Sequence, residues 1–210
     1  MKFELQDLSL EFGQLKLFRN LQISFQGPGI ITFLGPSGCG KSTLLRLLAG
    51  LQKPSSGKIL QPTGIKPGFI FQESHLLNWR NTFENVRLPL ELKPGDEAAV
   101  KPAIKSVGLE GSEKLFPSEL SGGMKMRVSL ARAFVTQPNL LFCDEPFAAL
   151  DEITRENLRD FLKNYVSMRS ALCFFVTHSL SEALAISSQI YHFEGQGNLR
   201  LEPFQVSAQS

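Results

Sequence analysis

Nine residues in the first quarter of the chain combine glycines, hydroxyl groups and one lysine at a spacing that suits phosphate binding. They are Gly35, Pro36, Ser37, Gly38, Cys39, Gly40, Lys41, Ser42 and Thr43. Gly35, Gly40, Lys41 and Ser42 fit a template of glycine, four free positions, glycine, lysine and a hydroxyl residue. In such a loop, Lys41 reaches the β- and γ-phosphates of a nucleotide and Ser42 offers its hydroxyl to Mg²⁺. We therefore predict a phosphate site, with the alternative that the glycines only close a tight turn.

The segments on either side of this loop predict the elements that such a site needs. Residues 29–35 form a short β-branched run that is typical of a buried strand, and residues 41–50 place leucines 44, 45, 47 and 48 on one helical face. Gly50 is expected to end this helix. A Gly-rich turn between a strand and a helix directs backbone N–H groups and the partial positive charge of the helix toward an anion.

Two later apolar runs end abruptly in polar residues, as buried parallel strands do when their carboxyl ends carry chemistry. The run at 139–146 reaches Asp144 and Glu145, and the run at 171–178 ends in His178. Asp144 is predicted to hold Mg²⁺ directly or through water, and Glu145 to polarise the water that attacks a phosphate. The alternatives are an Asp-Glu-Pro turn that caps a helix at 152–164, and a structural histidine at 178.

Composition and charge narrow the class of protein. The chain has 210 residues, 42% of them hydrophobic, which suits one domain or one domain with a subdomain. A formal charge of +2 without a dense Lys/Arg block does not indicate a nucleic-acid partner. Three cysteines without metal-ligand spacing suit a reducing compartment. No apolar stretch of signal-peptide or membrane-spanning length occurs, so we expect a cytosolic chain.

The remaining segments predict a second small-residue cradle and an inserted helical region. Residues 2–12 and 21–27 alternate apolar and polar side chains, as half-buried antiparallel strands do. A stretch with helical leanings and four prolines follows Gln72. After it, Ser121, Gly122 and Gly123 precede a helical segment at 125–134 and form a second possible phosphate cradle. One nucleotide hardly needs two cradles.

Six motifs occur in an order that resembles the ATP-binding cassette (ABC) ATPases of transporters. They are the phosphate loop, Gln72, residues 120–127, the run that ends in Asp144, Asp151 and His178. The resemblance covers about residues 3–195. It implies an α/β fold, a P-loop NTPase (RecA-like) core with an N-terminal antiparallel β subdomain and an inserted α-helical subdomain. We expect one cassette over 1–210, with 1–72 and 119–210 as the nucleotide-binding core and 73–118 as the helical subdomain.

The same resemblance implies roles for individual residues. It implies a head-to-tail homodimer in which each ATP lies between the phosphate loop of one subunit and Ser121, Gly122 and Gly123 of the other. Gln72 would sense Mg²⁺ and the attacking water, Glu145 would be the catalytic base, His178 the γ-phosphate switch, and Asp151 part of the loop that crosses the interface. Phe12 resembles the aromatic that stacks on adenine. Phe18 is a rival, and Phe12 could instead belong to the core, as an aromatic on an alternating strand usually does.

Within the family, the segments 71–92 and 106–124 most resemble ATPases of nitrate, sulfonate and taurine importers. Such a complex would include membrane permease subunits and a solute-binding protein, and it would place this chain on the inner face of the cell membrane. Four bulky apolar residues follow Gln72, where the family has a groove for a short helix of the membrane subunit: Leu76, Leu77, Trp79 and Phe83. The alternative is that these side chains pack inside the helical subdomain.

Three readings of the activity remain at this point. The leading one is an ATPase subunit that couples hydrolysis to solute import. An exporter of lipid or lipoprotein, and a soluble cassette ATPase of DNA repair or translation, are the alternatives. Two residues depart from the family pattern, because Met126 stands where glutamine is usual and Phe134 where a small or aliphatic residue is usual. These departures bear on how the helix after Gly123 packs.

Overall fold

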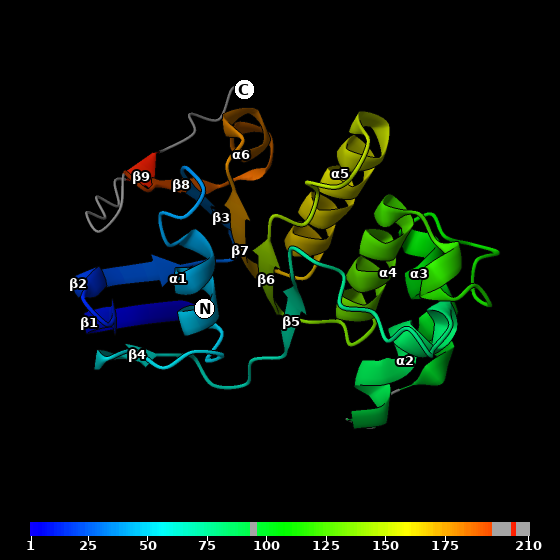
Figure 1. The fold of residues 1–210 in the computed structure, drawn as a ribbon, viewed down its shortest axis with the longest axis horizontal. Helices are drawn as coiled ribbons and strands as arrows, with labels where there is room; N and C mark the ends of the chain where they lie inside the picture. Colours follow the sequence, from blue (N-terminus) through cyan, green and yellow to red (C-terminus); the bar gives the residue numbers. More distant parts are fainter. Residues whose placement is uncertain (93–95, 195–202, 205–210) are drawn as a thin grey trace. The chain divides into compact units, whose positions relative to one another are not determined.

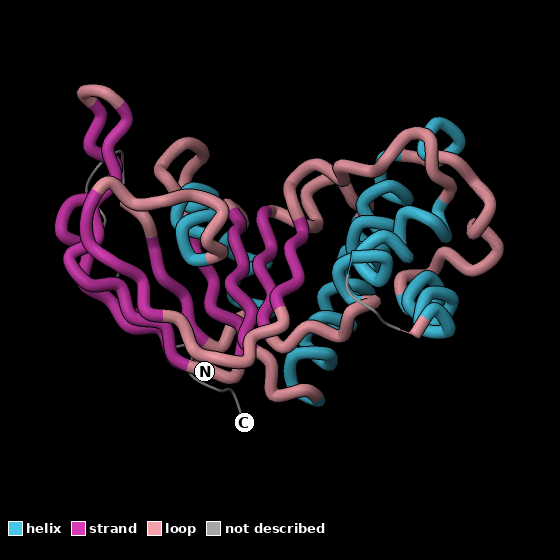
Figure 2. The backbone as a smooth tube through the Cα atoms, turned by 90° about the horizontal axis from the view of Figure 1, so that it is seen from below, coloured by secondary structure: helices cyan, strands magenta, loops and turns pink. Residues whose placement is uncertain are grey.

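The structure, a computed structural model, describes residues 1–92, 96–194 and 203–204 (Figure 1). The chain divides into two compact units. Unit 1 comprises residues 1–65 and 166–210, and unit 2 comprises residues 66–165. Strands predominate in unit 1 and helices in unit 2, as the colouring by secondary structure in Figure 2 shows.

Unit 1 contains a three-stranded antiparallel sheet in the order β2-β1-β4. Its strands are β1 (Lys2–Phe12), β2 (Leu15–Gln26) and β4 (Ser56–Leu60). The predicted alternation in β1 is confirmed, since Phe3, Leu5, Leu8 and Leu10 are all buried. The odd spacing between Leu5 and Leu8 would place them on opposite faces. A register shift between them, where Asp7 has a φ of 49°, keeps both on the buried face.

The second sheet region of unit 1 consists of parallel strands around β3 (Gly29–Leu34). β3 lies between β7 (Leu172–Thr177) and β8 (Gln189–His192), and β9 (Pro203–Phe204) pairs antiparallel with β8. All six residues of β7 are buried. Rings of Phe25, Phe33 and Phe174 meet at centroid distances of 5.4 to 5.8 Å and fill the core. Two helices follow strands of this region, α1 (Lys41–Leu48) and α6 (Leu180–Ile186).

Unit 2 combines two parallel strands with helices. The strands are β5 (Pro67–Ile70) and β6 (Leu140–Asp144). The α-helices are α2 (Thr82–Leu92), α3 (Val100–Ser106), α4 (Gly122–Phe134) and α5 (Glu152–Met168), and the part of α5 from Val166 onward belongs to unit 1. Short 3-10 helices occupy Glu97–Ala99 and Pro117–Glu119. Within the described part of 73–118 every regular element is a helix or 3-10 turn. The division into a core and a helical subdomain follows different boundaries from these two units and stays a prediction.

The two departures from the family pattern pack inside unit 2. Met126 is 3% exposed and Phe134 is 6% exposed. The ring of Phe134 contacts those of Phe161 and Tyr165 on α5, at 5.0 and 4.8 Å between centroids. The large ring therefore fills space between α4 and α5, and α4 forms over its full length in spite of the unusual residues.

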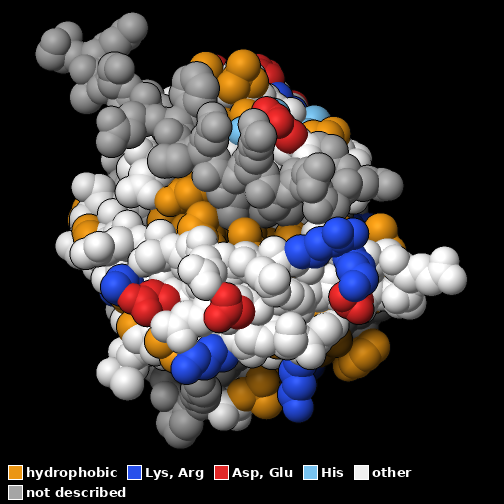
Figure 3. Space-filling view, turned by 90° about the vertical axis from the view of Figure 1, so that its left-hand side faces the viewer, with side chains coloured by type: hydrophobic (Ala, Val, Ile, Leu, Met, Phe, Trp, Pro, Cys, Tyr) orange, Lys and Arg blue, Asp and Glu red, His pale blue; other side chains and the backbone are white. Residues whose placement is uncertain are grey.

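Figure 3 shows how charged and hydrophobic side chains are distributed on one face of the molecule. On the face that Figure 3 shows, Lys and Arg side chains lie among Asp and Glu side chains rather than in a separate group. Lys16 and Glu11, for example, form an ion pair of 3.2 Å. In the described part of the chain, no helix is both long enough and apolar enough to cross a membrane. Cys39, Cys143 and Cys173 are buried.

Candidate nucleotide-binding site

The predicted phosphate loop connects β3 to α1 and encloses the ammonium group of Lys41. This side chain is 4% exposed, and its Nζ donates to the carbonyl oxygens of Gly35 and Pro36, both at 2.8 Å. A buried ammonium group needs such acceptors. It carries three donors, so the two carbonyl contacts leave it able to donate to a phosphate oxygen as well. The loop thus holds a positive charge at the N-terminus of a helix, where an anion is favoured.

The glycines of this loop are required for two different reasons. A Cβ atom at Gly35 would lie 2.8 Å from the carbonyl oxygen of Phe193, which is closer than real contacts allow. Gly38 and Gly40 have φ angles of 78° and 109°, which strain any residue with a side chain. Gly40 is also the N-cap of α1. The predicted strand, turn and helix are confirmed, and leucines 44, 45, 47 and 48 are all buried as predicted.

The two candidate adenine-stacking residues differ sharply in exposure. Phe12, at the end of β1, is 50% exposed, whereas Phe18 is 1% exposed. The ring of Phe18 lies beneath the phosphate loop, since its Cζ would be 3.3 Å from a Cβ atom at Gly40. Phe12 is therefore the one that offers a ring face to a ligand, and Phe18 supports the loop from below.

His178 directly follows β7 and is exposed between two residues whose hydroxyls hold the backbone. The Thr177 hydroxyl donates to the carboxylate of Glu182 and accepts from the backbone N–H of Ser179 at 3.1 Å. The hydroxyl of Ser179 accepts from the N–H of Glu182 at 3.2 Å and so caps α6. These contacts fix the backbone on both sides of His178. The predicted position of His178 at the carboxyl end of a strand is confirmed.

In unit 2, Asp144 is the last residue of β6 and Glu145 follows it, as predicted. Asp144 is 1% exposed, and Glu145 is half-buried with a φ of 45°. This left-handed conformation costs free energy for a residue with a side chain and is found at functional sites. The turn that follows is held by Arg155, whose Nη2 donates to the carbonyl oxygen of Leu150 at 2.8 Å and whose Nε donates to that of Phe147 at 3.4 Å.

Asp151 follows this turn and caps α5. Its carboxylate accepts from the N–H of Thr154 at 2.9 Å, and this hydrogen bond holds the pKa of Asp151 below its ordinary value. The α5 helix begins at Glu152 as expected and extends to Met168, four residues beyond the expected end. Asp151 therefore has a structural role in addition to the interface role that the resemblance implies.

The second cradle is the N-terminus of α4. Ser121 is the N-cap, its hydroxyl accepts from the N–H of Met124 at 3.2 Å, and the helix begins at Gly122, three residues earlier than the segment predicted from the sequence. Ser121 and Gly122 are exposed, and a Cβ atom at Gly122 would meet nothing within 4 Å. This open, capped helix terminus offers backbone N–H groups to an anion from outside the chain.

The segment after Gln72 is organised by a buried asparagine that the sequence analysis did not single out. Gln72 is exposed and follows β5 by two residues. The side chain of Asn85 is fully buried, and it accepts from the N–H of Leu77 at 2.8 Å while donating to the carbonyl oxygens of Leu77, Arg80 and Asn81. Trp79 is 74% exposed, whereas Leu76, Leu77 and Phe83 are half-buried. The packing alternative therefore does not hold for Trp79.

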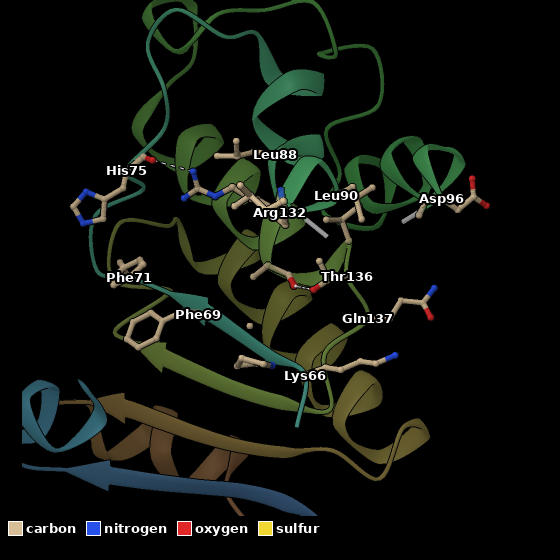
Figure 4. A pocket seen from close by; sticks show the side chains of 17 residues that line it. Lys66, Phe69, Phe71, His75, Leu88, Leu90, Asp96, Arg132, Thr136 and Gln137 are labelled. Atoms are coloured by element: carbon tan, nitrogen blue, oxygen red, sulfur yellow. Dashed lines mark hydrogen bonds between the residues drawn. The ribbon is translucent and has the colours of Figure 1, made fainter. Parts of the chain in front are cut away.

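Unit 2 also contains a cavity of about 850 Å³ (Figure 4). Phe69 and Phe71 line it beside β5, Leu88 lines it from α2, and Arg132 reaches across from α4 toward His75. None of the four residues predicted to form a docking groove is among its lining residues. One signal in the sequence points to Arg132, because a charged residue within the apolar run 128–135 needs a partner when the helix is buried.

Comparison with known proteins identifies the family. The profile described as "ABC transporter" matches residues 18–148, which is more than half of the chain. The chain belongs to the ABC transporter family. This ABC ATPase is 39% identical over 194 residues to the aliphatic sulfonates import ATP-binding protein SsuB 1 of Shouchella clausii, covering 92% of this chain and 78% of that protein. It is equally 39% identical over 181 residues to SsuB of Bacillus subtilis, covering 83% and 71%.

The fold of this ABC ATPase matches that of a solved cassette. A dimeric post-hydrolysis structure of the ATP-binding cassette MJ0796, bound to ADP and Pi, superimposes with a TM-score of 0.87 at 25% identity, over 98% of this chain and 99% of that one. The predicted fold class is confirmed. Lys41, Phe12 and His178 belong to unit 1, whereas Gln72, Ser121, Asp144 and Glu145 belong to unit 2. Their approach around one nucleotide is part of the proposal below.

Proposed function

We propose that this ABC ATPase is the ATP-hydrolysing subunit of an importer of small organic sulfonates, and that two copies bind two ATP molecules between them. The main support for the proposed dimer is that one chain has two separate phosphate cradles. These are the loop before α1 and the exposed, capped N-terminus of α4. Support for import of sulfonates comes from relatives such as SsuB 1 of Shouchella clausii, which are named for that substrate.

In the first cradle, the chain's own residues bind the triphosphate and the base. Lys41 donates to a phosphate oxygen in addition to the loop carbonyls, and the N–H groups of the first turn of α1 add donors. The exposed ring of Phe12 stacks on adenine, which excludes water from one face of the base. The side chain of His178 donates to a γ-phosphate oxygen from the end of β7.

Ser42, Gln72 and Asp144 are the residues that would hold Mg²⁺. Their hydroxyl, amide and carboxylate oxygens are the hard ligands that this ion prefers. When bound, the ion neutralises charge on the β- and γ-phosphates. Glu145, one residue beyond Asp144, accepts a proton from the attacking water, and its left-handed backbone conformation is of the kind that persists at functional sites.

In the second cradle, Ser121, Gly122 and Gly123 act on the nucleotide of the partner copy. The hydroxyl of Ser121 and the first N–H groups of α4 donate to the γ-phosphate from the opposite side. The loop 147–151, held by Arg155, lies next to this cradle, because a Cβ atom at Gly123 would be 3.5 Å from Leu150. Asp151 is thereby placed to take part in the contact between the two copies.

We further propose that the membrane permease subunits dock on unit 2. A short helix with an apolar face fits the 850 Å³ cavity, whose walls are largely aromatic and aliphatic. Trp79, 74% exposed, lies outside the cavity and offers an aromatic anchor. Docking would place the chain at the inner face of the cell membrane, with a solute-binding protein on the other side.

The proposed substrate class is tested by uptake in the cell of origin. Deletion of the gene for this chain should abolish uptake of ethanesulfonate and growth on it as the sole sulfur source, while growth on sulfate is unaffected. Expression of the intact chain should restore uptake, and expression of Lys41→Ala should not. Unchanged sulfonate uptake in the deletion strain, or loss of nitrate uptake or of lipid export instead, would contradict the proposal.

A further inference from the structure

Arg132, in the last turn of α4, binds the chain segment that follows Gln72. Its Nη1 donates to the carbonyl oxygen of His75 at 2.9 Å (Figure 4). Its Nη2 donates to that of Ser74 at 2.7 Å. The two acceptors are successive residues, 58 and 57 positions away in the sequence. The planar guanidinium group presents two parallel donors, and this geometry suits a pair of neighbouring carbonyl oxygens.

The segment that Arg132 holds has no regular structure of its own. No helix or strand covers residues 71–81, and His75 has a φ of 44°, a conformation that persists only where surrounding contacts enforce it. The ring of His75 packs edge-on against Phe71 at 5.2 Å, and Phe71 stacks on Phe69 at 4.1 Å. The strained residue is therefore held through its carbonyl by Arg132 and through its ring by Phe71.

The guanidinium group of Arg132 is partly buried and therefore depends on this contact. The side chain is half-buried, and burial lowers the pKa of the guanidinium from its ordinary value. An arginine nevertheless stays charged at neutral pH, so a positive charge is partly withdrawn from water. A charge in this position needs hydrogen-bond acceptors. The carbonyl oxygens of Ser74 and His75 supply them, and they lie two and three residues beyond Gln72.

We propose that Arg132 is a positioning residue for Gln72. By clamping Ser74 and His75 to the end of α4, it fixes the segment after Gln72 to the helix whose other end carries Ser121. Gln72 and Ser121 are thereby tied to one rigid element, about 20 Å long at 1.5 Å per residue. This inference rests on the proposed function, because it assumes that Gln72 and Ser121 both act on a nucleotide.

Arg127 provides a matched control on the same helix. It also donates to two successive carbonyl oxygens, those of Val107 and Gly108 at 3.5 and 3.0 Å, but these lie at the end of α3 rather than beside Gln72. Arg127→Gln removes a comparable arginine clamp, and Arg132→Gln removes the one that concerns Gln72. A general loss of packing in α4 would affect both variants, whereas a positioning role would affect only the second.

The experiment compares the intact chain, Arg132→Gln, Arg132→Lys and Arg127→Gln by amide hydrogen exchange and by steady-state ATP hydrolysis. In Arg132→Gln, exchange should accelerate by at least about tenfold in the peptide covering 72–80, because a hydrogen bond from a charged donor is lost. We expect kcat to fall several-fold with little change in KM for ATP or in melting temperature. Arg127→Gln should accelerate exchange at 105–111 and leave 72–80 as in the intact chain.

Several results would overturn the inference. Unchanged exchange at 72–80 in Arg132→Gln would show that the clamp does not hold the segment, and unchanged kcat would show that holding it does not matter. Full activity of Arg132→Lys together with unchanged exchange at 72–80 would contradict the two-point clamp, because lysine lacks the planar pair of donors. If Arg132→Gln does not fold, Arg132→Lys supplies the same comparison. Failure of the intact chain to hydrolyse ATP would instead refute the proposed function, and the exchange measurement would still decide the clamp.

Discussion

Replacement of Trp79 by alanine distinguishes two roles for this residue, contact with a partner subunit and packing inside the chain. An aromatic side chain buries at most about 250 Å², and Trp79 is 74% exposed. The buried part is then about 65 Å² at most, which corresponds to about 1.6 kcal/mol at about 25 cal/mol per Å². A tryptophan in a core would instead cost about 3 to 5 kcal/mol on truncation. The free energy of unfolding of the isolated chain should therefore fall by less than about 2 kcal/mol.

If Trp79 is an interface residue, its loss should weaken binding to the permease subunits. Loss of a central aromatic anchor costs about 2 kcal/mol or more in binding, or about a 30-fold weaker Kd. We would measure urea unfolding and ATP binding of the isolated chain, and then its affinity for the permease subunits with which the tagged intact chain co-purifies. Met168→Ala is the matched control, because Met168 is an 87% exposed apolar residue near the end of α5. A loss of stability above about 3 kcal/mol, or affinity equal to that of the control, would refute the reasoning.

Three further predictions concern the nucleotide site. Lys41→Ala should abolish ATP binding or hydrolysis in calorimetry and turnover assays, and near-normal turnover would refute the phosphate-loop assignment. Phe12→Ala should weaken ATP binding by about 5- to 150-fold without unfolding the chain. Phe18→Ala should instead lower the free energy of unfolding by about 3 to 5 kcal/mol. Two variants of equal stability and equal ATP affinity would contradict the assignment of Phe12 as the stacking residue. Because its pKa is lowered in the folded state, Asp151 stabilises the chain above its ordinary pKa of 3.8 and loses this effect as pH falls through the lower folded value. The stability difference from Asp151→Ala should be constant above about pH 5 and shrink below it in urea titrations, and a constant difference down to pH 2 would refute the cap.

The parts of the site that the sequence predicted depend on local rules. Gly35, Gly38 and Gly40 are needed because of a close contact and left-handed φ angles, and such requirements restrict residue type strongly. The leucines of α1 follow helical periodicity, and the apolar run before Asp144 has the length and composition of a buried strand. Each of these signals involves residues within about ten positions of one another.

The parts that the sequence did not predict depend on contacts between distant residues. The clamp between Arg132 and Ser74 joins residues 58 positions apart, and the spacing of neither residue indicates the other. The cavity beside Phe69 and Phe71 forms where β5, α2 and α4 meet, which no single segment encodes. The choice between Phe12 and Phe18 was likewise open, because a bulge in β1 shifts the alternation and only the resulting exposure distinguishes the two rings.

The most direct test of a shared nucleotide site uses Glu145→Gln. The substitution keeps the shape of the side chain and removes the anion that accepts a proton, so ATP should bind, persist and hold two copies together. Light scattering after size-exclusion chromatography should give twice the chain mass of 23.3 kDa with ATP and Mg²⁺, and a single chain mass with ADP. A variant that binds ATP and remains a monomer, or that hydrolyses ATP at the rate of the intact chain, would contradict the account.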